Sequence, residues 1–187
     1  MTGLPVVAAT GHRHLPSASM PWLRAELRRV AVKLRDEHGA TIGISGMALG
    51  GDMEWADAVG AAGVDLHAYV PFEGQELLWR PKDQERWQAL IGKAAVVRVL
   101  AGAPAGHRDA VRLLHARNDA MLAAASAVVA VWSPAERGGG TFTCVQKAAR
   151  RGMPVVHVNP VARVVHGPGC GCVAALAEQP ALPLFGA

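Results

Sequence analysis

The sequence predicts a three-layer α/β fold: a Rossmann-like, doubly wound, mainly parallel sheet of about six strands with helices on both faces. Short apolar runs of strand length alternate along the chain with longer stretches whose apolar residues recur at helical spacing. Several of these runs are continuously apolar, which indicates strands buried on both faces, as in parallel sheets. Each parallel connection needs a crossover helix, so the alternation itself favours this architecture.

Length and composition indicate one compact domain. The chain has 187 residues, of which 51% are hydrophobic and 18% charged, so it can build a substantial core and is not expected to be disordered. Apolar runs such as 121–132 are shorter than the roughly 20 residues that a membrane span needs. No basic region precedes the first apolar run, so we expect no signal peptide, no membrane contact and a cytoplasmic protein.

The first half of the chain contains four expected strands, at 4–10, 41–45, 64–70 and 95–100. A helix begins near Ser19 and ends at Gly39, because its leucines and valines recur at helical spacing and glycine is a common stop. A second helix, 53–62, leaves the glycine turn after the second strand. A third, at about 83–92, follows an irregular segment that contains Trp79.

The second half continues the alternation and ends in a less regular tail. A long helix is expected at 109–125, a buried strand at 127–132, a helix at 141–151 and a sixth strand at 154–158. We assign residues 1–160 to one Rossmann-like domain. The tail, 161–187, is rich in glycine and proline and has little periodicity beyond a possible short helix at 173–177, so we expect it to pack on the domain or extend it.

Four segments fall where expected strands end, at 10–13, 45–52, 71–72 (Pro-Phe) and 138–141, and three of them are rich in glycine or polar residues. The carboxyl ends of parallel strands lie on one edge of a sheet, so these segments can line a single crevice. The last of them, Gly138-Gly139-Gly140-Thr141, opens a helix. A glycine turn at a helix N-terminus offers free backbone N–H groups to an anion, usually a phosphate.

The ordered set of motifs resembles the SLOG superfamily. These motifs are T-G-H-R at 10–13, S-G-x-x-x-G-x-D-x-x-W-A at 45–56, H-x-R-N-x-x-M at 115–121 and G-G-G-T at 138–141. The superfamily includes YpsA-like proteins, LONELY GUY (LOG) phosphoribohydrolases and the DNA-processing DprA/Smf proteins. The resemblance covers residues 4–158 and is closest to the YpsA-like branch, in which Gly46, Gly51, Asp52 and Trp55 have counterparts.

The resemblance implies a nucleotide ligand and names the residues around it. Gly139, Gly140 and Thr141 would bind its phosphate, Thr10, Gly11 and Arg13 would approach the same ligand, and Ser45, Gly46 and Asp52 would contact its sugar or base. The chemistry of these side chains agrees, because arginine pairs with phosphate and aspartate can bind ribose hydroxyls. The remaining candidate ligand contacts are His12, Gly51, Arg117, Asn118 and Gly138.

One departure from the family pattern bears on catalysis. The LOG pattern places a glutamate three residues after the threonine of the glycine motif, where it acts with an arginine in cleaving an N-glycosidic bond. Here Arg117 is present, but Cys144 occupies the position of the glutamate. A thiol cannot stabilise an oxocarbenium-like transition state as a carboxylate does. If the protein is an enzyme, the candidate catalytic residues are Arg117, Asp52 and Glu54, with Glu136 as a further carboxylate.

Three functions therefore stay open: a nucleotide-binding or sensor protein, an N-glycosidase acting on nucleoside monophosphates, and a single-stranded nucleic-acid binder. We favour the first. The net charge of +4 suits a phosphate-bearing ligand and is too mild to require nucleic acid. We also expect a homodimer, because the helix at 111–125 is rich in alanine and leucine on more than one face.

Metal ions and cofactors are not expected. Cys170 and Cys172 lack a second ligand pair at zinc spacing, and His12 and His14 have no clear carboxylate partner. With three cysteines and no C-x-x-C pair, reduced thiols are the expected state. Cys144 is expected to be a small buried residue, although a position near a helix N-terminus would also suit a reactive thiolate.

Overall fold

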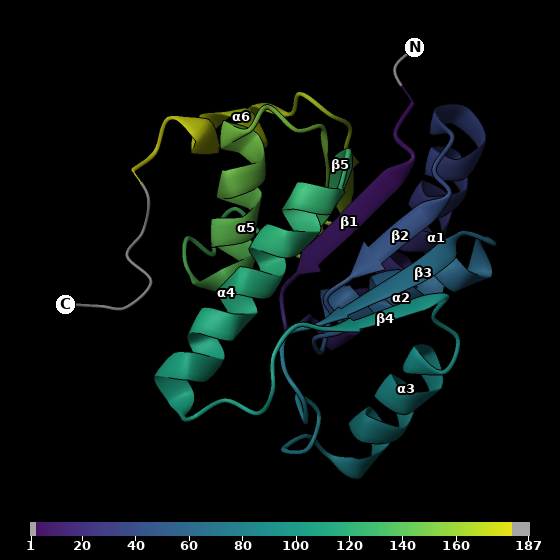
Figure 1. Ribbon diagram of the computed structural model, residues 1–187. Coiled ribbons are helices and arrows are strands. Elements are labelled where there is room, and N and C mark those ends of the chain that lie inside the picture. Colours follow the sequence, from purple (N-terminus) through teal and green to yellow (C-terminus); the bar gives the residue numbers. More distant parts are fainter. Residues whose placement is uncertain (1–2, 181–187) are drawn as a thin grey trace.

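A computed structural model describes residues 3–180 and confirms the three-layer α/β architecture (Figure 1). Within these residues, one sheet of seven strands has the order β4-β3-β2-β1-β5-β6-β7. All neighbouring strands are parallel except β6 and β7. The order changes direction between β1 and β5, and ligands of open α/β sheets bind at such switch points. The strands are β1 (Val6–Gly11), β2 (Ile42–Ser45), β3 (Asp65–Val70), β4 (Val96–Val99), β5 (Ala127–Val131), β6 (Val155–Asn159) and β7 (Val164–His166).

Helices cover both faces of the sheet. A short 3₁₀ turn, η1 (Ser17–Ser19), leads into the first helix. One face carries α1, α2 and α3, whose apolar side chains join those of the strands in one core cluster. The other face carries α4, α5 and α6, which pack over two smaller clusters (Figure 1). The helices are α1 (Met20–His38), α2 (Gly51–Ala61), α3 (Pro81–Ile91), α4 (His107–Ala124), α5 (Gly139–Arg150) and α6 (Gly171–Ala177).

The expected elements are found, with shifts of a few residues at their ends. A seventh strand, β7, is the main difference, since the sequence predicted about six. β7 has three residues and pairs antiparallel with β6, so it is too short to produce a period in the sequence. The short helix expected in the tail exists as α6 and packs against α5. The rest of the tail, 181–187, lies outside the described residues.

The edge strand β4 is unlike the other strands, because its four residues are all exposed. Val97 and Val99 are 43% and 50% exposed, and Leu100 follows at 37%. The apolar residues of α4 are better covered, since Leu113, Met121 and Leu122 are buried. α4 also carries exposed alanines, at 116, 123 and 124, while the larger exposed apolar side chains lie on β4 and at Leu77 and Leu78.

A close contact between a strand and a helix fixes the spacing of β2 and α2. A Cβ added at Gly43 would lie 2.5 Å from a methyl carbon of Val59, whereas real Cβ atoms essentially never approach within 3.0 Å. Glycine at this position lets the β-branched valine of α2 pack directly on the strand.

Gly43→Ala should destabilise the fold by about 1–3 kcal/mol, the usual cost of overpacking a core. The double variant Gly43→Ala with Val59→Ala should recover part of this loss, because the smaller side chain at residue 59 removes the clash. Urea unfolding of the two single variants and the double variant measures the coupling. Strictly additive losses would contradict the close packing. Gly60→Ala, whose added Cβ meets nothing within 4 Å, is the control and should not destabilise the fold, because alanine is favoured over glycine in a helix.

Candidate functional site

The candidate site lies at the carboxyl edge of the sheet, around the switch point between β1 and β5. The end of β1, the turn after β2, the N-termini of α2 and α5, and the middle of α4 meet there. A chain of hydrogen bonds links them through Gly11, Asp52, Arg117 and Thr141. The structure thus brings together the predicted segments 10–13, 45–52 and 138–141.

A buried ion pair occupies the centre of this edge. Arg117 of α4 donates from Nη1 to Asp52 Oδ2 at 2.9 Å, and each side chain is only 5% exposed. The other carboxylate oxygen of Asp52 accepts a hydrogen bond from the backbone N–H of Gly11 at 3.0 Å. Burial raises the pKa of Asp52, while the Arg117 guanidinium and the Gly11 N–H oppose that rise. Both oxygens of Asp52 therefore have partners within the protein.

Arg117 has hydrogen-bonding capacity left over. Its Nε is buried and has no hydrogen-bond partner within residues 3–180. A buried N–H without a partner costs free energy, and a bound ligand or an ordered water can satisfy it. Four other buried side-chain atoms in these residues also have no partner: Nε1 of Trp55 and Trp87, Oε1 of Gln75 and Oε2 of Glu76. The guanidinium is therefore held by Asp52 at one nitrogen and unsatisfied at another.

Gly46 makes room for the arginine. A Cβ at this position would lie 1.0 Å from Arg117 Nη1 and 2.7 Å from Asp52 Oδ2, so any side chain here would displace the ion pair. The sequence suggested that Gly46 contacts the ligand. In the structure its lack of a side chain has a clear packing reason.

Ser45 is also used internally. Its hydroxyl donates to the carbonyl oxygen of Asp52 at 2.7 Å and accepts from the N–H of Met47 at 3.1 Å. Met47 has a positive φ of 55°, and Gln75 donates to its carbonyl oxygen at 2.9 Å. The Ser45 and Gln75 contacts hold a left-handed turn that a methionine rarely adopts. Ser45 thus shapes the turn before α2, and its side chain is fully buried.

Close backbone packing joins the ends of β1 and α2. A Cβ at Gly11 would lie 2.6 Å from the Cα of Gly51, so neither residue can carry a side chain without movement of the backbone. The N–H of Gly51 also donates to the carbonyl oxygen of His12 at 3.0 Å. These two glycines are therefore explained by packing, as the glycines of a strand–helix contact often are.

The glycine turn is open to solvent. Gly138, Gly139 and Gly140 are exposed, and an added Cβ at Gly138 or Gly139 would meet nothing within 4 Å. Gly139 has a φ of 77°, which requires glycine for reasons of backbone conformation. The first N–H groups of a helix have no partner within it, and Gly138 offers no side-chain cap to α5.

Two side chains fix this turn to the rest of the edge. Thr141 donates from its hydroxyl to the carbonyl oxygen of Gly11 at 2.9 Å, and Asn118 donates from Nδ2 to the carbonyl oxygen of Gly140 at 3.4 Å. Asn118 follows Arg117 on α4, so the ion pair and the glycine turn are held by neighbouring residues of one helix.

His12 connects the end of β1 to the loop after β5. Its Nε2 accepts from the backbone N–H of Ser133 at 3.0 Å, and its Nδ1 lies 3.3 Å from a carboxylate oxygen of Glu136. Sequence reasoning did not find this link, because the spacing of the residues gives no signal of it. Arg13, next in the chain, is exposed and places its guanidinium 5.7 Å from the centre of the Trp79 ring. The neighbouring Thr10 is buried.

Two further candidate groups, Glu54 and Cys144, are buried among other partners. Glu54 is buried between Arg24 of α1 and Arg86 of α3, at 2.9 and 2.6 Å, and so joins helices on one face of the sheet. Cys144 is buried among apolar residues of α5, and desolvation raises the pKa of its thiol to about 12. The thiol is therefore protonated at neutral pH, which argues against a reactive thiolate.

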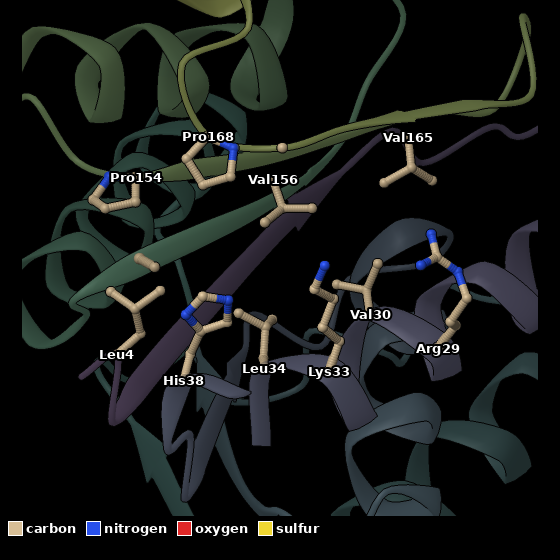
Figure 2. Close-up of a pocket in the computed structure, with 12 residues that line it drawn as sticks. Leu4, Arg29, Val30, Lys33, Leu34, His38, Pro154, Val156, Val165 and Pro168 are labelled. Atoms are coloured by element: carbon tan, nitrogen blue, oxygen red, sulfur yellow. The ribbon is translucent and has the colours of Figure 1, made fainter. Parts of the chain in front are cut away.

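A separate cavity of about 240 Å³ lies at the opposite, amino end of the strands (Figure 2). Leu4, Ala127 and Pro154, which precede or begin β1, β5 and β6, line it together with residues of α1 such as Lys33 and His38. None of the candidate site residues lines this cavity. None of the helices in residues 3–180 is long and apolar enough to cross a membrane.

No protein-family model and no curated protein matches the chain. Solved structures do match it. DNA processing protein A (DprA) from Streptococcus pneumoniae matches with a TM-score of 0.57 and 18% identity, over 94% of this chain and 55% of its own. DprA from Helicobacter pylori, described with a single-stranded DNA binding mode, gives 0.58 and 18%, over 83% and 66%. TM1055, a structural-genomics target, gives 0.51 and 19%, over 83% and 72%.

At these identities the likeness is one of fold. DprA belongs to the superfamily that the motifs resemble, so the match agrees with the fold which that resemblance implies. The three structures do not distinguish the YpsA-like branch. The chain spans 55% and 66% of the two DprA chains, so what those proteins do as wholes is not carried over by the match.

His12 should make the stability of the protein depend on pH. Burial lowers the pKa of His12 from 6.5, against an opposing effect of Glu136. The unfolded histidine takes up a proton below about pH 6.5, which the folded one resists, so stability falls as the pH drops through this range. Between about pH 7.5 and 5.5, His12→Gln should lose less stability than the wild type in urea unfolding. Equal losses of stability in the wild type and in His12→Gln would contradict this prediction. The pKa values of His115 and His157 are also lowered, but both residues are present in the wild type and in the variant, so their effect cancels in the comparison.

Proposed function

We propose that the protein binds a nucleotide or a nucleotide-derived small molecule at this edge, with a phosphate at the N-terminus of α5. The observation that carries the proposal is the exposed glycine turn at 138–140. Asn118 links this turn to α4, the helix that also holds Arg117, whose Nε has no hydrogen-bond partner. A helix N-terminus and a guanidinium both favour an anion, and glycine allows its close approach.

The other polar residues of the edge would support the ligand indirectly. Asp52 and Ser45 already use their oxygens within the protein, so their proposed role is to hold Arg117 and the turn before α2 in place. The sugar and base would then lie toward the exposed side of 11–13. There, the Arg13 and Trp79 pair offers a planar cation and an aromatic ring on which a base can stack.

Gly140→Val tests the phosphate position. An added Cβ would lie 3.8 Å from Asn118 Nδ2, and no left-handed φ constrains the residue, so the fold should persist. The larger side chain would project beside the N–H groups of α5 and should weaken nucleotide binding by at least about 10-fold, or 1.4 kcal/mol. Calorimetry with a panel of nucleoside mono-, di- and triphosphates measures the change.

Gly60→Val is the matched control for this experiment. Gly60 meets nothing within 4 Å and lies in the last turn of α2, away from the carboxyl edge, so its valine variant should bind as the wild type does. Unchanged affinity in a folded Gly140→Val variant would reject the site. Failure of the wild type to bind any nucleotide of the panel would reject the proposed function itself.

An N-glycosidase is the enzymatic alternative, and the positions of the carboxylates speak against it. Asp52 is paired with Arg117, Glu54 with two arginines, and Glu136 with His12. Glycosidic cleavage needs a carboxylate beside the sugar that is able to exchange a proton or stabilise positive charge. A binding or sensor role fits these engaged carboxylates better.

The wild-type protein should therefore release no measurable free base from common nucleoside monophosphates. Chromatography of overnight reactions checks this. Cys144→Glu should give weak activity at best, because it would bury a carboxylate where the thiol packs among apolar side chains. Clear base release by the wild type, lost in Asp52→Asn or Glu54→Gln, would establish the enzyme in place of the binder.

Single-stranded nucleic acid is the second candidate ligand. The observations that favour it are the pair of the exposed Arg13 and the half-buried Trp79, and the DprA fold, in which single-stranded DNA binding is described for the Helicobacter pylori protein. Such binding weakens steeply with salt, because each neutralised phosphate releases counterions. A strong salt dependence with oligonucleotides, together with weak binding of mononucleotides, would favour this candidate.

We also propose a homodimer in which β4 forms part of the contact. Its exposed valines and its unpaired backbone edge are features that proteins usually cover. Pairing of β4 with the same strand of a second copy would bury both the valines and the backbone edge. Light scattering that gives a monomer mass at micromolar concentration would reject this arrangement.

A further inference from the structure

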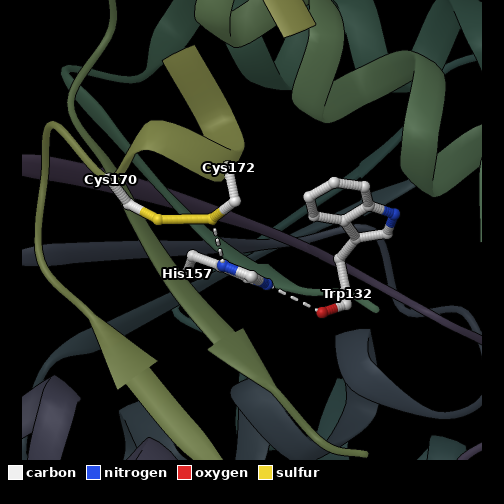
Figure 3. The surroundings of a disulfide bond; sticks show 4 residues. All are labelled: Trp132, His157, Cys170 and Cys172. Carbon is white, nitrogen blue, oxygen red and sulfur yellow. Dashed lines mark hydrogen bonds between the residues drawn. A yellow bond between two sulfur atoms is a disulfide. The ribbon is translucent and has the colours of Figure 1, made fainter. Parts of the chain in front are cut away.

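A cluster of metal-ligating side chains lies away from the carboxyl-edge site, where the C-terminal segment packs on β6 (Figure 3). Cys170 and Cys172 form a disulfide, so the expectation of reduced thiols is wrong for this pair and holds only for Cys144. Nδ1 of His157 lies 3.0 Å from Cys172 Sγ. The Nδ1 atom and the two sulfurs all lie within 4.8 Å of one another.

The orientation of His157 is set by its other nitrogen. Nε2 lies 2.8 Å from the carbonyl oxygen of Trp132, which can only accept a hydrogen bond, so Nε2 carries the proton. Nδ1 then has a free lone pair, and Figure 3 shows this nitrogen facing the sulfur of Cys172. The residue is 1% exposed, so water does not readily serve this lone pair. A disulfide sulfur has no hydrogen to donate, which leaves the buried acceptor facing an atom that cannot satisfy it.

The same arrangement is typical of a metal-ligating histidine. One ring nitrogen donates to a backbone carbonyl, which fixes the tautomer and aims the other at the metal. Two thiolates and one imidazole are ligands that Zn²⁺ prefers, and a tetrahedral ion keeps a fourth position for solvent. Cys170 and Cys172 are half-buried, so solvent can reach that position.

We propose that Cys170, Cys172 and Nδ1 of His157 bind one Zn²⁺ ion when the disulfide is reduced. A dithiol or phosphine reductant supplies the two electrons that break the S–S bond, and the sulfurs leave this step as two thiols. Binding of Zn²⁺ then displaces the two thiol protons, while the imidazole keeps its proton on Nε2. The disulfide and the zinc site exclude each other, because both use the same sulfur atoms.

Only the zinc-bound state would tie the turn before α6 to the sheet, because the disulfide joins two residues of the same segment. α6 packs on α5, and Gln146 of α5 donates from Nε2 to the carbonyl oxygens of Gln179 and Pro180. Beside these contacts, the zinc ion would add bonds from Cys170 and Cys172 directly to a residue of β6. The site is therefore structural in this proposal, and it is independent of the nucleotide site.

The test uses the full chain, made metal-free and reduced with a phosphine that does not itself supply a thiol. Zinc titration against a chromophoric chelator should give one ion per chain, and the oxidised protein should bind none at this site. Co²⁺ in place of zinc should give the visible absorption of a tetrahedral ion and thiolate-to-metal charge-transfer bands. Reduced wild-type protein that does not bind zinc, or that binds only Cu⁺, would overturn the proposal.

Single-cysteine variants assign the site. Cys170→Ala and Cys172→Ala should each weaken zinc binding at least about 10-fold, the lower end of what even outer-shell changes cost at metal sites. Cys144→Ala is the matched control, because it removes a buried thiol outside the cluster and should leave zinc affinity unchanged. Thermal melts in the absence of metal show whether each variant is folded. Equal losses in all three cysteine variants, or none in Cys172→Ala, would reject the site.

Discussion

The buried ion pair between Asp52 and Arg117 holds together three elements that are far apart in the sequence. Through it, the N-terminus of α2 is joined to the middle of α4, and the second oxygen of Asp52 extends the link to the end of β1. Removing one partner of such a pair leaves an uncompensated buried charge and typically costs about 3–5 kcal/mol. The shape of the carboxyl edge depends on this interaction.

Several small residues of the edge follow from that requirement. Gly46 is free of a side chain because the guanidinium passes over it, and Gly11 and Gly51 let the strand and the helix approach closely enough for Asp52 to reach the β1 backbone. These glycines resemble ligand-binding residues in the sequence. In the structure they form the support of the site, while the glycines at 138–140 form its open surface.

The carboxyl edge of the sheet and the cluster beside β6 differ in which polar groups lack partners. At the carboxyl edge Asp52 is paired with Arg117, and the groups without partners include the donors Arg117 Nε and the first N–H groups of α5, together with one acceptor, Oε1 of Gln75. Unsatisfied donors favour an anion. Beside β6 the unsatisfied group is an acceptor, Nδ1 of His157, and it faces two sulfurs. An acceptor beside sulfur ligands favours a cation. The same accounting of donors and acceptors thus points to a phosphate in one place and to a metal in the other.

The sequence by itself determined the fold class and the position of the edge. Strands buried on both faces appear as continuous apolar runs, and helices buried on one face appear as apolar residues at helical spacing. These two patterns place the strands and helices correctly. It also identified the segments that meet at the edge, because the ends of parallel strands must lie together. Only the tertiary structure decided how these residues are used. Asp52 pairs with Arg117, which is 65 residues away in the sequence, and Glu54 pairs with Arg24 and Arg86. His157 of β6 contacts Cys172. Such pairings depend on which faces of packed elements meet, and spacing along one chain does not record that.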